Sequence, residues 1–106
     1  MADYQLDSCV EEELMVIWRF IAKGNPASAT RVVEAAYETF AVLASMPGIG
    51  RLGRFSEPYF EGVRSWPVIG FGNYLVLYRT VAGGIQVHHI IHSARNIDAM
   101  MGGEEN

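Results

Sequence analysis

The chain has 106 residues, of which half are hydrophobic and 19% are charged, and it carries a formal net charge of −4. This length fits a single domain over residues 1–106, and the composition is that of a globular protein, which excludes a disordered or fibrous one. The acidic balance argues against sequence-specific binding to nucleic acid, because neutralisation of phosphates supplies most of the affinity of such proteins.

Two amphipathic helices are predicted in the first half of the chain. Ser8 and Glu11 have the spacing of a capping box, and the apolar residues that follow recur every three or four positions, which predicts a helix over about Ser8–Lys23. Gly24-Asn25-Pro26 then supplies a stop, an N-cap and a first helical residue. A second helix is predicted over Pro26–Ser45, and the short turn makes the pair an antiparallel helical hairpin.

β-strands are predicted mainly in the second half, after a glycine-rich loop over residues 47–54. Phe71-Gly72-Asn73 and Ala82-Gly83-Gly84 are turn signals that separate runs rich in β-branched and aromatic residues, as in an antiparallel meander. The expected strands are Tyr4–Leu6 at an edge, Val63–Val68, Tyr74–Arg79 and Ile85–His92. The predicted fold is therefore α+β, with the N-terminal helical hairpin packed on one face of a small antiparallel β-sheet.

A short C-terminal helix is predicted after the last strand, over Ile97–Met101. Ile97, Met100 and Met101 lie on one apolar face of this single turn. Because so short a helix is not stable alone, it must dock on something. Docked on its own sheet it would be structural, whereas undocked its methionines would offer an adaptable contact surface to a partner.

Several segments, in order over roughly residues 4–100, resemble the RelE/ParE toxin superfamily. The segments are Ile17–Ala22 in its first helix, Leu43–Arg51 at its second-helix exit, and Val63–Trp66 and Tyr74–Arg79 in its central strands. Residues 90–96 resemble the closing strand and turn of the ParE branch, with Asn96 where an aspartate is usual. The resemblance implies a toxin of a type II toxin–antitoxin system of the plasmid-stabilisation kind.

The resemblance leaves three functions open. ParE-like members are non-enzymatic inhibitors of DNA gyrase that arrest growth, whereas RelE-like members are ribosome-dependent mRNA endoribonucleases; a degenerate member would only bind its partner. The acidic composition and the single lysine, Lys23, favour the ParE-like function over the nuclease. The expected partners are then DNA gyrase as target and a cognate antitoxin of the ribbon-helix-helix type in a 2:2 complex.

The candidate site residues differ between these functions. RNA cleavage needs a base, an acid and cations at the phosphate, and the candidates for these roles are Arg64, Arg79, His92 and Arg95. We favour no catalytic residue, because the chain has few cations. The residues predicted to contact the target or the antitoxin are Arg64, Trp66, Arg79, Arg95, Ile97, Met100 and Met101.

No metal ion or other cofactor is expected from the sequence. His88 and His92 share one face of an ideal strand but lie about 13 Å apart, and His89 points to the other face. Cys9 is the only cysteine, so disulfides and multi-cysteine zinc sites are excluded, and the neighbouring glutamates oppose a thiolate. Residues 48–53 match GxGxxG but follow a helix instead of a strand, which is unsuited to nucleotide binding.

The expected location of the chain is the cytoplasm. No apolar run approaches the roughly 18 residues that a membrane span needs. The first residues lack the basic start and the apolar stretch of a signal peptide.

Overall fold

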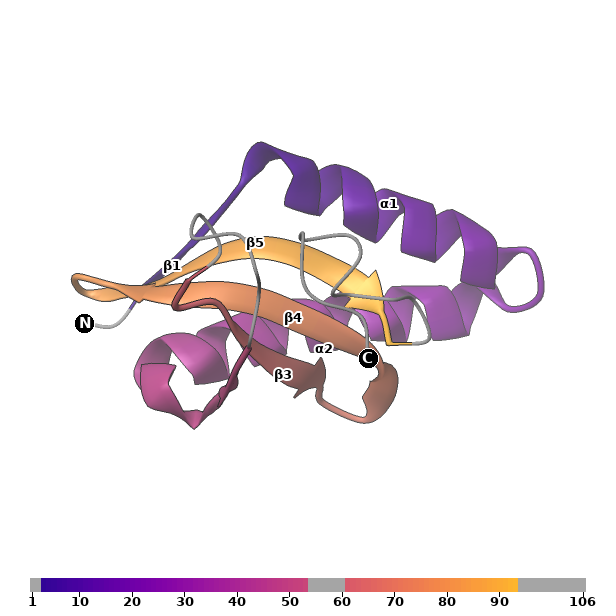
Figure 1. Ribbon diagram of the computed structural model, residues 1–106. Helices are drawn as coiled ribbons and strands as arrows, with labels where there is room; N and C mark the ends of the chain where they lie inside the picture. The colour runs from indigo at the N-terminus through magenta and orange to yellow at the C-terminus, as the bar shows by residue number, and fades with distance from the viewer. Residues whose placement is uncertain (1–2, 54–60, 94–106) are drawn as a thin grey trace, which may run out of the picture.

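The computed structural model describes residues 3–53 and 61–93, in which two helices pack on a five-stranded sheet (Figure 1). The elements are β1 (Asp3–Leu6), α1 (Ser8–Ala22), α2 (Pro26–Ser45), the 3-10 helix η1 (Pro47–Ile49), β2 (Arg51–Leu52), β3 (Arg64–Val68), β4 (Phe71–Val81) and β5 (Gly84–His92). The predicted α+β fold with an N-terminal helical hairpin is confirmed. None of the described helices is long and apolar enough to span a membrane.

The sheet is mixed, whereas the sequence predicted an antiparallel one. The strand order is β1-β5-β4-β3-β2, and β1 pairs in parallel with β5 while all the other pairs are antiparallel. Two-residue turns join β3 to β4 and β4 to β5 and fix those pairs as antiparallel, whereas most of the chain lies between β1 and β5. No local signal therefore sets the direction of β1.

The helices follow their predicted bounds closely. The side chain of Asn25 caps α2 by accepting a hydrogen bond from the Ser28 N–H at 3.1 Å. The capping box predicted at Ser8 and Glu11 is wrong, because α1 begins at Ser8 and the N-cap is Asp7. The carboxylate of Asp7 makes no capping bond and instead binds two side chains of β5, as described below.

β4 and β5 are longer than predicted, whereas β3 begins one residue later than the predicted strand Val63–Val68. Phe71-Gly72-Asn73 is the start of β4 instead of a turn, and the chain reverses at Ile69-Gly70. Gly70 has a φ of 76°, a conformation that glycine adopts without steric cost. The predicted loop over residues 47–54 contains η1 and the two-residue strand β2, which pairs with β3.

The main core lies between the helical hairpin and the sheet. Phe40 and Leu43 of α2 pack there against residues of β4 and β5, including the fully buried Tyr78. The Tyr78 hydroxyl accepts a hydrogen bond from the Gly50 N–H at 2.9 Å and donates one to the Pro47 carbonyl at 2.8 Å. A smaller buried cluster contains Val63, Leu77 and Ile91.

A β-bulge interrupts the pairing of β4 with β5. Leu77 pairs with His89 and Tyr78 pairs with Val87, so His88 is the extra residue on β5. The strict alternation that the sequence predicted for the histidines of this strand therefore does not hold. The short helix predicted over Ile97–Met101 lies outside the described residues.

Candidate functional site

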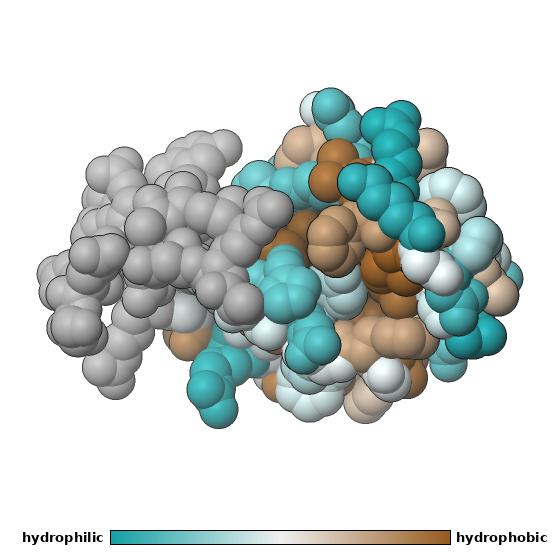
Figure 2. All heavy atoms as spheres, turned by 90° about the vertical axis from the view of Figure 1, so that its right-hand side faces the viewer, coloured by the Kyte–Doolittle hydropathy of each residue, from teal (hydrophilic) through white to brown (hydrophobic). Residues whose placement is uncertain are grey.

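An apolar groove of about 540 Å³ lies between α1 and the ends of β4 and β5. Val16, Ile17 and Phe20 line it from the helix, and Tyr74 and Ile90 line it from the sheet. The Phe20 side chain is unusually open for an aromatic residue, with 71% of its surface exposed. Figure 2, which views the end of the molecule that carries the α1–α2 turn, shows apolar side chains exposed among hydrophilic ones. This surface is suited to an apolar partner segment.

The outer edge of β5 runs beside this groove. β1 pairs with Gly84 to Val87 only, so no described strand covers that edge along residues 88–92. Two side chains of α1 form hydrogen bonds with backbone groups of this edge. Glu13 accepts one from the Ile90 N–H at 3.0 Å, and the Cys9 thiol donates one to the His88 carbonyl at 3.2 Å. A partly open strand edge beside an apolar groove is typical of surfaces that accept an added strand or an amphipathic segment.

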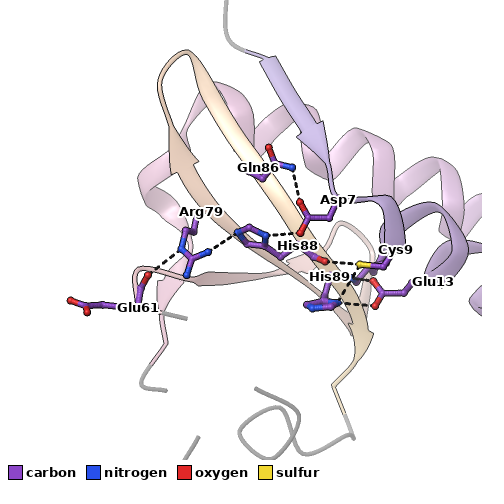
Figure 3. A network of polar contacts seen from close by, with 9 residues as sticks. Asp7, Cys9, Glu13, Glu61, Arg79, Gln86, His88 and His89 are labelled. Atoms are coloured by element: carbon purple, nitrogen blue, oxygen red, sulfur yellow. Dashed lines mark hydrogen bonds and ion pairs between the residues drawn. The ribbon is translucent and has the colours of Figure 1, made fainter. Parts of the chain in front are cut away.

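A chain of polar contacts ties the start of α1 to the sheet (Figure 3). The Asp7 carboxylate binds Gln86 Nε2 at 2.7 Å and His88 Nδ1 at 2.8 Å, and His88 Nε2 lies 3.2 Å from Arg79 Nη1. Because a guanidinium only donates, the contact with Arg79 assigns His88 Nε2 as the acceptor and its Nδ1–H as the donor to Asp7. Burial alone would raise the pKa of Asp7, but the bonds from His88 and Gln86 outweigh it and lower that pKa.

A second polar cluster joins Cys9, Glu13 and His89 (Figure 3). His89 Nδ1 lies 2.8 Å from a Glu13 oxygen and 3.7 Å from the Cys9 sulfur, so a helix and a strand meet here. The bond to Glu13 raises the pKa of His89. Burial, together with the charges of Glu13 and Asp7, raises the pKa of the Cys9 thiol. Sequence reasoning missed this cluster because Cys9 and His89 lie 80 positions apart, and the one local signal was the i, i+4 spacing of Cys9 and Glu13.

The four described residues of the predicted site lie in different environments. Arg64 donates to the Gly50 carbonyl at 2.8 Å, and so helps to hold the segment after η1. Trp66 is partly buried against the main core, and Arg79 also donates to the Glu61 carbonyl at 3.1 Å. His92 lines the groove, where its ring meets Tyr74 edge-on. The remaining predicted residues, Arg95, Ile97, Met100 and Met101, lie outside the described residues.

The three described candidates for RNA cleavage do not converge. Arg64 pairs with Tyr78, whereas Arg79 follows Tyr78 in β4 and therefore faces the opposite side of the sheet. His92 pairs with Tyr74, five positions from Arg79 along β4, which corresponds to about 17 Å. The structure thus brings together neither a base with a cation nor two cations from this set.

Comparisons with known proteins agree with the fold. A family model described as the ParE toxin of the type II toxin–antitoxin system parDE matches residues 4–97. The chain is also similar to a solved structure from the chromosomal ParDE TA system from P. aeruginosa, with a TM-score of 0.68 and 20% sequence identity. That similarity covers 87% of this chain and 96% of the other. A search of curated proteins found no match.

Proposed function

Since the chain belongs to the ParE toxin family of type II toxin–antitoxin systems, we propose that it is a non-enzymatic inhibitor of DNA gyrase that a cognate antitoxin neutralises. The observation that carries the proposal is the separation of Arg64, Arg79 and His92, which the nuclease function would need at one phosphate. Both arginines hold backbone carbonyls of their own chain instead. An inhibitor that acts by binding needs no such convergence.

The antitoxin is proposed to occupy the groove beside α1. An amphipathic helix would place its apolar face against Phe20 and Val16, and an extended segment would pair with the outer edge of β5 near Ile90. Either mode covers apolar surface that the free chain leaves in water. We expect a ribbon-helix-helix antitoxin, whose dimeric N-terminal part would give a 2:2 complex in the cytoplasm.

A further set of residues is proposed to contact gyrase or the antitoxin. The candidates are Arg64, Trp66, Arg79, Arg95, Ile97, Met100 and Met101, with the C-terminal residues required for growth arrest. If the C-terminal residues are needed for growth arrest but not for antitoxin binding, the antitoxin will still bind a truncated toxin that has lost its activity. Truncation of the C-terminal end tests it, as described in the Discussion.

The proposal is tested with purified chain in a gyrase supercoiling assay and with total RNA from cells that express it. We expect supercoiling to be inhibited, restored by added antitoxin, and bulk mRNA to stay intact. Codon-periodic cleavage of mRNA would overturn the proposal in favour of the RelE-like nuclease.

His92→Gln separates the two functions further. His92 is the candidate base of the nuclease but is not among the proposed gyrase contacts. We therefore expect this variant to arrest growth as the wild type does. Loss of arrest with an unchanged circular dichroism spectrum would favour the nuclease.

A further inference from the structure

We propose that Cys9, Glu13 and His89 form a binding site for one Zn²⁺ ion. This inference does not depend on the proposed function, because it concerns a polar cluster at the start of α1. One sulfur, one carboxylate oxygen and one imidazole nitrogen lie within 4.8 Å of one another there. These three ligand types are the ones that zinc takes in proteins.

The spacing of the three ligand atoms is close to that of a tetrahedral zinc site. With bonds of about 2.3 Å to sulfur and 2.0 Å to nitrogen, tetrahedral geometry separates sulfur from nitrogen by about 3.5 Å. The Cys9 sulfur and His89 Nδ1 are 3.7 Å apart. The Glu13 oxygen lies 2.8 Å from the same nitrogen and would move away by about 0.5 Å to reach its place around the ion.

The backbone already orients two of the ligands. Cys9 and Glu13 are four positions apart on α1 and thus share one helix face, while His89 reaches them from β5. The second Glu13 oxygen accepts the Ile90 N–H at 3.0 Å, which fixes the carboxylate from outside the site. Such outer hydrogen bonds are typical of metal-ligating side chains.

The local charge favours a cation. Asp7, Glu12 and Glu13 are the charged groups that act on the Cys9 thiol, and all three are acidic. On binding, the thiol proton leaves to solvent as the zinc–sulfur bond forms, and His89 Nδ1 offers its lone pair while its proton moves to Nε2. Cys9 and Glu13 also line the groove, so water can reach the cluster from that side.

The thiolate selects among metals. Ca²⁺ and Mg²⁺ prefer oxygen ligands only, whereas a mixed sulfur, nitrogen and oxygen set in tetrahedral geometry suits Zn²⁺. The prediction from the sequence missed this site because it considered only histidines of the same strand as joint ligands. The fold instead pairs one histidine with two side chains of a helix.

The test uses the purified full chain without an affinity tag, titrated with Co²⁺ and then with Zn²⁺. We expect one Co²⁺ per chain, a near-ultraviolet sulfur-to-cobalt band and visible bands of a tetrahedral site, all removed by Zn²⁺. Cys9→Ser, Glu13→Gln and His89→Gln should each weaken binding at least about 10-fold. Glu34→Gln and His92→Gln are matched controls outside the cluster and should leave the affinity within about 2-fold.

A second measurement, the rate of alkylation of Cys9, uses the wild-type chain without any substitution. Zn²⁺ should slow alkylation of Cys9 by iodoacetamide at least about 10-fold, because the bound thiolate is no longer free to react. Circular dichroism checks the fold of each variant. Absence of the sulfur-to-cobalt band, unchanged alkylation in Zn²⁺, or equal weakening in the matched controls would each overturn the proposal.

Discussion

Phe20 gives the sharpest test of the proposed antitoxin groove. A fully buried phenylalanine removes about 200 Å² from water, and 71% of the Phe20 surface is still exposed in the free chain. Covering the remaining roughly 140 Å² is worth at most about 3.5 kcal/mol at 25 cal/mol/Å². We therefore expect Phe20→Ser to weaken antitoxin binding by between about 10-fold and 300-fold.

The same substitution should leave the free chain almost unchanged. Serine and phenylalanine have similar helix propensities, and the exposed ring contributes little to folding, so the free energy of unfolding should change by less than about 0.5 kcal/mol. Isothermal titration calorimetry with the antitoxin gives the Kd, and urea unfolding gives the stability.

Leu52→Ser is the matched control for Phe20→Ser. Leu52 is 55% exposed but lies in β2, at the opposite edge of the sheet from β1 and the groove. It should change the Kd by less than about 3-fold, as a surface substitution outside the contact does. Wild-type affinity in a folded Phe20→Ser chain, or an equal loss in Leu52→Ser, would refute the placement of the antitoxin.

Three further predictions concern the fold and the C-terminal end. Tyr78→Phe removes the hydroxyl that binds Gly50 and Pro47, so it should lower the free energy of unfolding by about 1–3 kcal/mol in urea titrations; an unchanged midpoint would contradict this. Gly50→Ala should destabilise the chain by about 1–3 kcal/mol, because its Cβ would overlap the Tyr78 ring; thermal unfolding at wild-type temperature would show that the ring moves freely. Deletion of residues 97–106 should abolish growth arrest on plates yet leave a folded chain that captures antitoxin. Arg95→Ala should also reduce growth arrest, but by less. Full killing by the truncated chain would show that this end is dispensable.

Local signals were sufficient to predict the helical hairpin. Asn25 and Pro26 define the start of α2, and the side chain of Asn25 binds a backbone N–H only three residues away. The bounds of both helices follow the spacing of apolar residues. The N-terminal cap of α1 was mispredicted because a distant partner competes for it. The Asp7 carboxylate binds His88, which no local pattern at residues 7–11 reveals.

The parts of the site that depend on the register of strand pairing could not be predicted from the sequence. A strand pattern assigns alternate side chains to alternate faces, but the bulge at His88 shifts that alternation within β5. The parallel pairing of β1 decides where α1 begins and therefore which side chains face the β5 edge. The cluster of Cys9, Glu13 and His89 depends on both the bulge and the pairing of β1. The spacing of these residues along the sequence therefore could not predict it.

The groove follows from a difference in length between two paired strands. β1 ends at Leu6, opposite Val87, while β5 continues to His92, so α1 has to run beside the remaining edge. The first two turns of α1 supply side chains that bind this edge, since Glu13 reaches the Ile90 N–H. The later turns carry Val16 and Phe20, which have no such contact and leave apolar surface in water. A partner that lies along α1 would cover both the open edge and this surface at once, which supports the proposed position of the antitoxin.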